Sequence, residues 1–200
     1  MHITDESIFE APPQDPVPVL RSWLNHAIEN NASEPGAMAF ATAGTSGRPS
    51  NRIIQILEIR PEGLVFATHA QSPKGKDIAE TGWASGVFYW RETKRQAIVS
   101  GIVAPLPDRD SDILWSSRPV ESHAMSTVST QSATLEDEEA LRAHALEARK
   151  AGALPRPKGW LGYILRPSAV EFWQFAPDRL YKRLRYEGTE SAWASRRLQP

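Results

Sequence analysis

Proline is the residue type that most restricts how this chain can fold, because it occupies 16 of the 200 positions. The usual share in globular proteins is about 5%. Proline fixes its own backbone, lacks an N–H group and interrupts both helix interiors and central strands. A chain interrupted this often must be built from many short elements, so a plain bundle of long helices is disfavoured.

Apolar and β-branched residues between these interruptions follow the period of strands. Two such runs, residues 86–90 and 96–104, are joined by the polar turn Arg91–Lys94 and predict a hairpin. Strands this close together, without a regular helix between each pair, favour an antiparallel barrel with flanking helices. The expected fold class is therefore mostly β with flanking helices (α+β). The other expected strands cover residues 38–42, 52–59, 64–68, 160–165, 170–175, 180–186 and 193–198.

Helix signals stand at both sides of these strands. Asp15 is a good N-cap and Pro16 suits the first helical position, which predicts a helix that two asparagines end at residues 30–31. Ser72 and Pro73 repeat this arrangement at the start of a second, short helix. That helix is expected to reach residue 80, and charged helices are expected over residues 108–117 and 135–151, with a serine-rich loop over residues 122–132.

The residues before Asp15 are polar and proline-rich, which predicts a flexible N-terminal arm over residues 1–14, followed by a single domain over residues 15–200. The arm is acidic and lacks an apolar run, so it does not resemble a secretory signal. No stretch approaches 18 consecutive apolar residues, so no membrane helix is expected. These features predict a cytoplasmic protein without a membrane partner.

Charge and cysteine content exclude several classes of function. The net charge of −1 argues against a polybasic arm, so nucleic acid is not an expected partner. The absence of cysteine excludes disulfides, thiolate metal sites, iron–sulfur clusters and cysteine nucleophiles. The five histidines are scattered without metal-ligand spacing, so no metal site is predicted. The chain also lacks the P-loop, GxGxxG, HExxH and GxSxG motifs.

Basic and amide side chains near strand ends are what remains. Lys74 and Lys76 lie in the first turn of the helix that opens at Ser72, where free N–H groups and the helix dipole suit a phosphate. Taken singly, each such residue fits an ordinary surface position better than a ligand contact. The residue pattern alone thus predicts a mostly β protein that is compatible with a phosphorylated ligand. The other residues of this kind are Arg52, Gln96, Gln131, Ser132, Arg179 and Arg183.

Ordered motifs from about residue 17 to residue 200 resemble the pyridoxine 5′-phosphate oxidase family. The paired Gln131-Ser132 and the final Arg-Leu-Gln-Pro block are the most specific of them. Residues 83–86, 89–93, 123–126 and 184–186 resemble the phenazine-biosynthesis flavin oxidase branch of that family. The remaining motifs are Arg52-Ile53-Ile54, Ser72-Pro73-Lys74-Gly75-Lys76, Arg95-Gln96, Ser117-Arg118-Pro119, Glu171-Phe172-Trp173 and the segment from Arg179 to Arg183.

This resemblance implies a split β-barrel and a homodimer with FMN bound at the subunit interface. The family usually has arginine directly before the phosphate lysine, where this chain has Pro73, and Lys76 is a candidate substitute. The resemblance implies that Gln131 and Ser132 come from the other subunit. The implied cofactor-binding residues are Arg52, Ile53, Thr68, Ser72, Lys74, Lys76, Gln96, Gln131, Ser132, Trp173 and Arg183.

The implied substrate site departs from that of pyridoxine phosphate oxidases. Leu57 and Leu114 replace the lysine and tyrosine that hold the substrate phosphate there, and Tyr181 replaces a histidine. Two charge-assisted partners are thereby lost and one wall becomes apolar. With Arg118, Ser122 and Arg179 kept, the site suits a small aromatic carboxylate better than a phosphate ester.

The resemblance therefore implies an FMN-dependent oxidase of phenazine biosynthesis. It would aromatise a reduced phenazine carboxylate by hydride transfer to flavin N5, with O2 as acceptor and H2O2 as product. No general base is assigned. The alternatives left open are a pyridoxine/pyridoxamine 5′-phosphate oxidase of vitamin B6 metabolism and a flavin-binding module without turnover.

Overall fold

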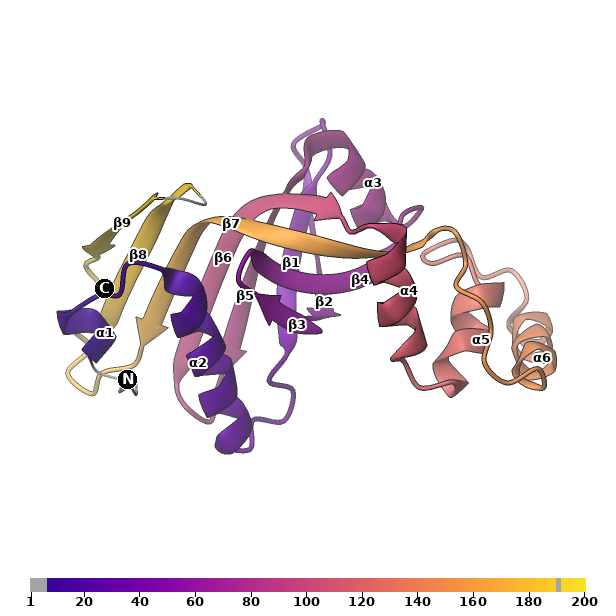
Figure 1. The fold of residues 1–200 in the computed structure, drawn as a ribbon, viewed down its shortest axis with the longest axis horizontal. Helices are drawn as coiled ribbons and strands as arrows, with labels where there is room; N and C mark the ends of the chain where they lie inside the picture. Colours follow the sequence, from indigo (N-terminus) through magenta and orange to yellow (C-terminus); the bar gives the residue numbers. More distant parts are fainter. Residues whose placement is uncertain (1–6, 190–191) are drawn as a thin grey trace.

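Nine strands of the described chain form one antiparallel sheet, with helices attached around it (Figure 1). The computed structural model describes residues 7–189 and 192–200. The strands are β1 Ala37–Ala43, β2 Pro49–Gln55, β3 Glu58–Arg60, β4 Gly63–His69, β5 Trp83–Trp90, β6 Arg95–Pro105, β7 Trp160–Gln174, β8 Lys182–Thr189 and β9 Ala192–Arg197. The helices are α1 Ser7–Glu10, α2 Pro16–Glu29, α3 Pro73–Thr81, α4 Asp108–Ser116, α5 Glu121–Val128 and α6 Glu138–Arg149.

The sheet follows the strand order β2-β1-β5-β6-β7-β4-β3, and β8 and β9 extend it from β7. β7 is its longest strand and serves two neighbours along one edge: residues 160–165 pair with β4, and residues 169–174 pair with β8. The two ends of the strand order, β2 and β3, do not pair with each other in the described chain. The predicted fold class is confirmed, as an antiparallel sheet with flanking helices that is not closed by hydrogen bonds.

Two strand predictions need correction, and both errors concern where the chain turns. The run 52–59 is two strands, because residues 56 and 57 leave β2 and bond instead to Gly36 and Val65. The runs 160–165 and 170–175 belong to the single strand β7. Pro167 within it faces a register shift between Ser100 and Gly101 of β6, and such an irregularity is where a strand tolerates proline.

The helix predictions at the two proline-led starts are confirmed. Asp15 caps α2 through Val17 N at 2.9 Å, and Ser72 caps α3 through Gly75 N at 3.3 Å. The predicted loop over residues 122–132 is wrong in its first half, which forms α5. His123 explains this, since its ring is buried and contacts the backbone of Trp115 and Leu154. That tertiary contact outweighs the weak helix preference of the serines around it.

Residues 7–14 are not a free arm. Ile8 and Phe9 are buried in the main core, and Pro13 O accepts a hydrogen bond from Tyr186 Oη at 3.0 Å. Residues 1–6 of the predicted arm lie outside the described residues. In the part of the chain that the structure describes, no helix is long and apolar enough to cross a membrane.

The core lies between the sheet and α2. Trp23 of α2 meets Phe172 of β7 edge-on, with ring centroids 4.9 Å apart. Phe40, Phe66 and Tyr163 continue this aromatic core from β1 through β4 to β7. A second, smaller cluster joins Leu114 and Trp115 of α4 to residues of β4 and β7. β4 thus packs against both clusters, which fixes the position of its end and of the start of α3.

Candidate functional site

Four of the predicted cofactor residues meet where β4 ends and α3 begins. Lys74 Nζ donates to Gln131 Oε1 at 3.1 Å and to Ser72 Oγ at 3.3 Å. Thr68 Oγ1 donates to the same Gln131 oxygen at 3.1 Å. Lys74 is only 8% exposed. We call Thr68, Ser72, Lys74 and Gln131 the lysine cluster.

Local sequence explains how this cluster is built. Ser72 Oγ donates to His69 O at 2.7 Å and accepts from Gly75 N, so the cap ties the end of β4 to the first turn of α3. A Cβ on Gly75 would lie 2.5 Å from Ala70 O, so only glycine allows this close approach. Pro73 occupies the first helical turn, where its missing N–H costs nothing. Gly75 N and Lys76 N both donate to Ser72 and Pro73 has no N–H, so the backbone N–H of Lys74 is the donor that the first turn of α3 leaves open.

Positive charge accumulates next to the cluster. Burial and the nearby Arg52 guanidinium lower the pKa of Lys74. Burial also lowers the pKa of Arg52, while the Asp77 carboxylate opposes that shift. Arg52 Nη1 donates to Thr42 Oγ1 at 2.7 Å, and Thr42 in turn donates to Asp77 Oδ2 at 2.7 Å. Asp77 thus compensates Arg52, whereas the hydrogen bonds of Lys74 go to Ser72 and Gln131 and not to a carboxylate.

Arg118 lies beside two tryptophan rings near the same region. Its guanidinium carbon lies 4.8 Å from the Trp115 centroid and 5.2 Å from the Trp160 centroid. Its Nη2 donates to Ser126 Oγ at 2.9 Å, whereas Nη1 is buried without a hydrogen-bond partner among the described residues. Burial lowers the pKa of Arg118. An arginine with an unused buried donor and no carboxylate contact suits an anionic ligand.

His69 is a member of this region that sequence reasoning missed. Burial, followed by the charges of Arg118 and Lys74, lowers its pKa, so it lies within the field of both cations. It is the last residue of β4 and its carbonyl accepts the Ser72 cap. The only signal in the sequence was its place directly after Thr68, at the end of a strand.

A second set of predicted residues forms a row across three strands. The register places Gln96 of β6 opposite Trp173 of β7, and Trp173 opposite Arg183 of β8. Directly opposed residues share a face of an antiparallel sheet. Tyr181 packs against Trp173 with ring centroids 5.1 Å apart. We call Gln96, Trp173 and Arg183 the cross-strand row.

The lysine cluster and the cross-strand row lie far apart in one chain. Thr68 pairs with Leu161 at the start of β7, while Trp173 lies near its end. The stretch of β7 from residue 161 to residue 173 is about 40 Å long at a rise of about 3.3 Å per residue. In Figure 1, β4 and α3 lie beside the first half of β7, and β8 lies beside its second half. A ligand that contacts both sets needs two chains.

The structure differs from the expectation on which residues a partner would supply. Gln131 was expected from the other subunit, yet here it contacts Lys74 and Thr68 of its own chain. Ser132 follows it with a φ of 67° and is exposed. Within one chain, Gln131 contacts Lys74, whereas the predicted cofactor residues of the cross-strand row lie far from it.

The remaining predicted residues are not gathered at either set. Ile53 is 67% exposed on the outer face of β2, and Lys76 is exposed on α3. Leu114 is buried in the small core cluster, while Leu57 is 47% exposed. The predicted apolar wall of Leu57 and Leu114 therefore stays a prediction.

Two predicted substrate residues also have unexpected surroundings. Ser122 Oγ donates to Pro119 O at 2.7 Å, and the hydroxyl that Arg118 contacts belongs to Ser126. Arg179 is exposed and has a φ of 65°, which is unusual for a residue with a side chain.

Comparisons with known proteins identify the family. Residues 24–151 match the family described as pyridoxamine 5′-phosphate oxidase, and residues 160–200 match the pyridoxine 5′-phosphate oxidase C-terminal dimerisation region. The chain belongs to the pyridoxamine 5′-phosphate oxidase family. The predicted resemblance is thereby confirmed, and so is the prediction of an oxidoreductase.

The similar proteins fall into two groups by name. A dihydrophenazinedicarboxylate synthase of Burkholderia lata is 47% identical over 96% of this chain and 91% of its own length. A pyridoxine/pyridoxamine 5′-phosphate oxidase of Mannheimia succiniciproducens is 39% identical over 93% of this chain and 89% of its own length. The crystal structure of PhzG from Burkholderia lata in complex with tetrahydrophenazine-1-carboxylic acid covers 96% of both chains at a TM-score of 0.94 and 46% identity.

Proposed function

We propose that this protein is an FMN-dependent oxidase that aromatises reduced phenazine carboxylates in phenazine biosynthesis. The observation that carries this proposal is the lysine cluster: a buried cation at a helix start, beside Arg52, whose hydrogen bonds go to neutral oxygens. The greater identity to a phenazine enzyme than to a vitamin B6 oxidase supports the choice of pathway.

The residues of the lysine cluster fit the phosphate of FMN. Lys74 has lost much of its hydration and is repelled by Arg52, so an added dianion would stabilise both cations. The N-terminus of α3 adds the backbone N–H of Lys74 and the positive end of a helix dipole. Thr68 and Ser72 add hydroxyl groups. Lys76 is exposed and supplies the long-range charge that Pro73 cannot.

When bound, FMN supplies the redox chemistry, accepting two electrons from the substrate and passing them to dioxygen, which leaves as hydrogen peroxide. The protein's own residues bind and orient. Arg118, which contacts two tryptophan rings and has Nη1 unused, holds a carboxylate of the substrate. Trp173 and Tyr181 offer an aromatic wall for a flat ring.

A homodimer completes the site. The sheet face that carries Tyr89, Gln96 and Trp173 also exposes apolar side chains: Ile53 is 67% and Tyr89 58% exposed, and Trp83 lies on the same face by register. An exposed apolar surface on a folded domain is typical of a protein interface. A second chain seated here brings its lysine cluster toward this chain's cross-strand row. The match of residues 160–200 to a dimerisation region supports this arrangement.

The experiment that tests the function is an anaerobic flavin spectrum. The protein is loaded with FMN, freed of excess and mixed either with tetrahydrophenazine-1-carboxylic acid or with pyridoxine 5′-phosphate. We expect the first to bleach the flavin band and the second to leave it unchanged. Replacement of Arg118 by Met should slow the bleach, whereas Arg109→Ala on the exposed side of α4 should not.

Three results would contradict the proposal. Rapid bleaching by pyridoxine 5′-phosphate would assign the chain to vitamin B6 metabolism. A retained flavin band that neither compound bleaches would favour a flavin carrier. A protein that retains no flavin band would exclude the flavoenzyme altogether.

A further inference from the structure

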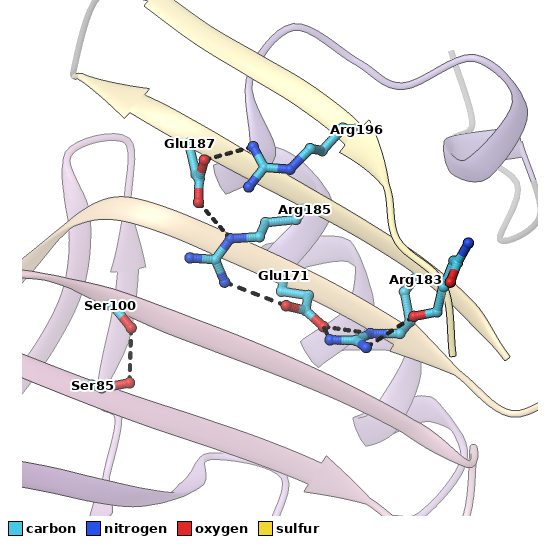
Figure 2. A network of polar contacts seen from close by, with 8 residues as sticks. Ser85, Ser100, Glu171, Arg183, Arg185, Glu187 and Arg196 are labelled. Atoms are coloured by element: carbon cyan, nitrogen blue, oxygen red, sulfur yellow. Dashed lines mark hydrogen bonds and ion pairs between the residues drawn. The ribbon is translucent and has the colours of Figure 1, made fainter.

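A chain of alternating charges crosses the last three strands of the sheet (Figure 2). It runs from Arg196 through Glu187, Arg185 and Glu171 to Arg183. Three arginines against two glutamates leave one positive charge in excess. The network ends at Arg183, which is a member of the cross-strand row.

Glu171 is the buried member of this network and favours one arginine over the other. Its side chain is 5% exposed. Glu171 Oε1 accepts from Arg183 Nε at 2.9 Å and from Arg183 Nη2 at 2.6 Å, while Oε2 accepts from Arg185 Nη1 only at 3.4 Å. Yet Arg185, not Arg183, is its direct partner across the strands. The carboxylate therefore reaches diagonally to draw Arg183 into place.

The end of the described chain holds the other side of the same guanidinium. Arg183 Nη1 donates to Gln199 O at 3.0 Å. The backbone of Arg183 is also fixed, because its carbonyl accepts from Leu198 N at 3.2 Å and from Arg197 Nε at 3.0 Å. The two hydrogen bonds to Glu171 and the one to Gln199 use three of the five N–H donors of the Arg183 guanidinium. Two donors remain, one on Nη1 and one on Nη2, for a ligand on the face with Gln96 and Trp173.

We propose that Glu171, together with the Gln199 carbonyl, is the positioning element of Arg183, fixing its two remaining N–H donors for the flavin. This inference rests on the proposed function, since it assumes that FMN contacts the cross-strand row. Glu171 itself does not touch the ligand. Its role is to fix the rotamer of Arg183 before FMN binds. The conformational entropy of that side chain is then not lost on binding, which strengthens the affinity for FMN.

The test measures FMN binding to the FMN-free protein by quenching of flavin fluorescence, with no turnover involved. Glu171→Gln keeps the shape but removes the charge that holds Arg183, and it should weaken FMN binding about tenfold. Glu187→Gln is the matched control, because Glu187 contacts Arg185 and Arg196 but not Arg183. It should change FMN affinity less than about twofold, within the range of an exposed ion pair.

A double-mutant cycle separates positioning from folding. Glu171→Gln introduced into Arg183→Ala should weaken FMN binding no further, because its only route to the ligand is gone. If Glu171→Gln does not fold, Glu171→Asp keeps the charge and shifts the carboxylate. It should then lower FMN affinity while the urea unfolding midpoint stays near that of the wild type.

The outcomes distinguish this inference from the function it rests on. The inference alone is overturned if wild-type protein binds FMN and Glu171→Gln binds it as tightly as Glu187→Gln does. It is also overturned if the loss persists in the Arg183→Ala background, or if Glu171→Asp binds FMN like the wild type. Wild-type protein that takes up no FMN overturns both.

Discussion

Lys74 shows at the scale of a single residue how a candidate anion site lowers the stability of the fold. Its ammonium group is buried and repelled by Arg52, and its hydrogen bonds go to the neutral oxygens of Ser72 and Gln131. A buried charge without an opposite charge is unfavourable in a folded protein. Its lowered pKa expresses that cost, because the fold favours the uncharged amine.

Replacing Lys74 by Met should therefore separate stability from binding. We expect the free energy of unfolding of the FMN-free protein to stay equal or rise by up to about 1 kcal/mol, since a buried charge is exchanged for an apolar chain of similar length. FMN binding should fall at least tenfold, as expected on loss of a charge-assisted contact. Urea unfolding and fluorescence titration check the two quantities.

Lys76→Met is the control for this prediction. Lys76 lies on the same helix but is exposed. Lys76→Met should leave the free energy of unfolding unchanged, and it should lower the affinity for FMN less than Lys74→Met does. A Lys74→Met protein that is much less stable than the wild type would show that Lys74 supports the fold.

Some single residues could be predicted from the sequence and others could not. Ser72 and Lys74 lie within one short motif and the resemblance also located Thr68; the strand-to-helix turn brings the three together. The resemblance implies Gln131 from the other subunit, whereas in this chain Gln131 contacts Lys74 and Thr68, because motif order does not say which subunit a loop faces. His69 and Glu171 were missed, since their importance depends on neighbours from α3 and from β8.

At the scale of elements, β8 holds the N-terminal segment to the sheet through Tyr186. Its hydroxyl donates to Pro13 O at 3.0 Å, directly before the Asp15 cap of α2. Burial, followed by the charge of Asp15, raises the pKa of Tyr186 to about 12. The folded state thus keeps the Tyr186 proton at pH values where the unfolded chain, with an ordinary tyrosine pKa of about 10, has lost it.

Tyr186→Phe should lower the free energy of unfolding by about 1 kcal/mol at neutral pH, the usual contribution of one hydrogen bond. The contribution of Tyr186 is fully present below pH 10 and is lost as the pH rises toward 12. The difference in unfolding free energy between wild type and variant should therefore shrink over that interval. Urea unfolding between pH 7 and pH 11.5 measures it.

The Tyr186→Phe variant provides the comparison for this experiment, because it lacks the titrating hydroxyl group. A difference between wild type and Tyr186→Phe that stays constant from pH 7 to pH 11.5 would contradict the assigned pKa shift.

Helices and strands were predicted correctly where nearby residues determine their ends. They were predicted wrongly where contacts with residues distant in the sequence determine them. The capped starts of α2 and α3 carry their own signals in Asp15, Pro16, Ser72 and Pro73. α5 does not, because its stability depends on the contacts of His123 with residues far along the chain. β7 reads as two strands in the sequence, because Pro167 interrupts a pairing that tolerates it only at a register shift.

At the scale of the whole molecule, the separation of the lysine cluster from the cross-strand row makes a prediction about mixed dimers. Lys74→Ala and Arg183→Ala should each weaken FMN binding at least about tenfold when introduced alone, while leaving it measurable at higher FMN concentrations. In a mixed dimer, one site combines both substitutions and the other carries neither, so up to half of the sites regain FMN binding. Co-expression with two affinity tags and measurement of bound flavin per dimer checks this.

Lys74→Ala with Gln131→Ala is the negative control for the mixed dimer. Both residues belong to the same cluster of one chain, so every site in that mixed dimer keeps one substitution and none regains full binding. Recovery in this pair but not in the Lys74 and Arg183 pair would return Gln131 to the partner subunit.

The unbroken length of β7 has a consequence for how such enzymes can diverge. One strand carries both Leu161, which pairs with Thr68 of the lysine cluster, and Trp173 of the cross-strand row. Its length therefore sets the distance between these two sets of residues in one chain. Side chains alternate between the faces of a strand, so one inserted residue would turn Trp173 to the wrong face. Two inserted residues would keep Trp173 on its face and increase the distance between the lysine cluster and the cross-strand row by about 7 Å. A change of one residue would therefore need a further irregularity like the one at Pro167, whereas a change of two residues would not.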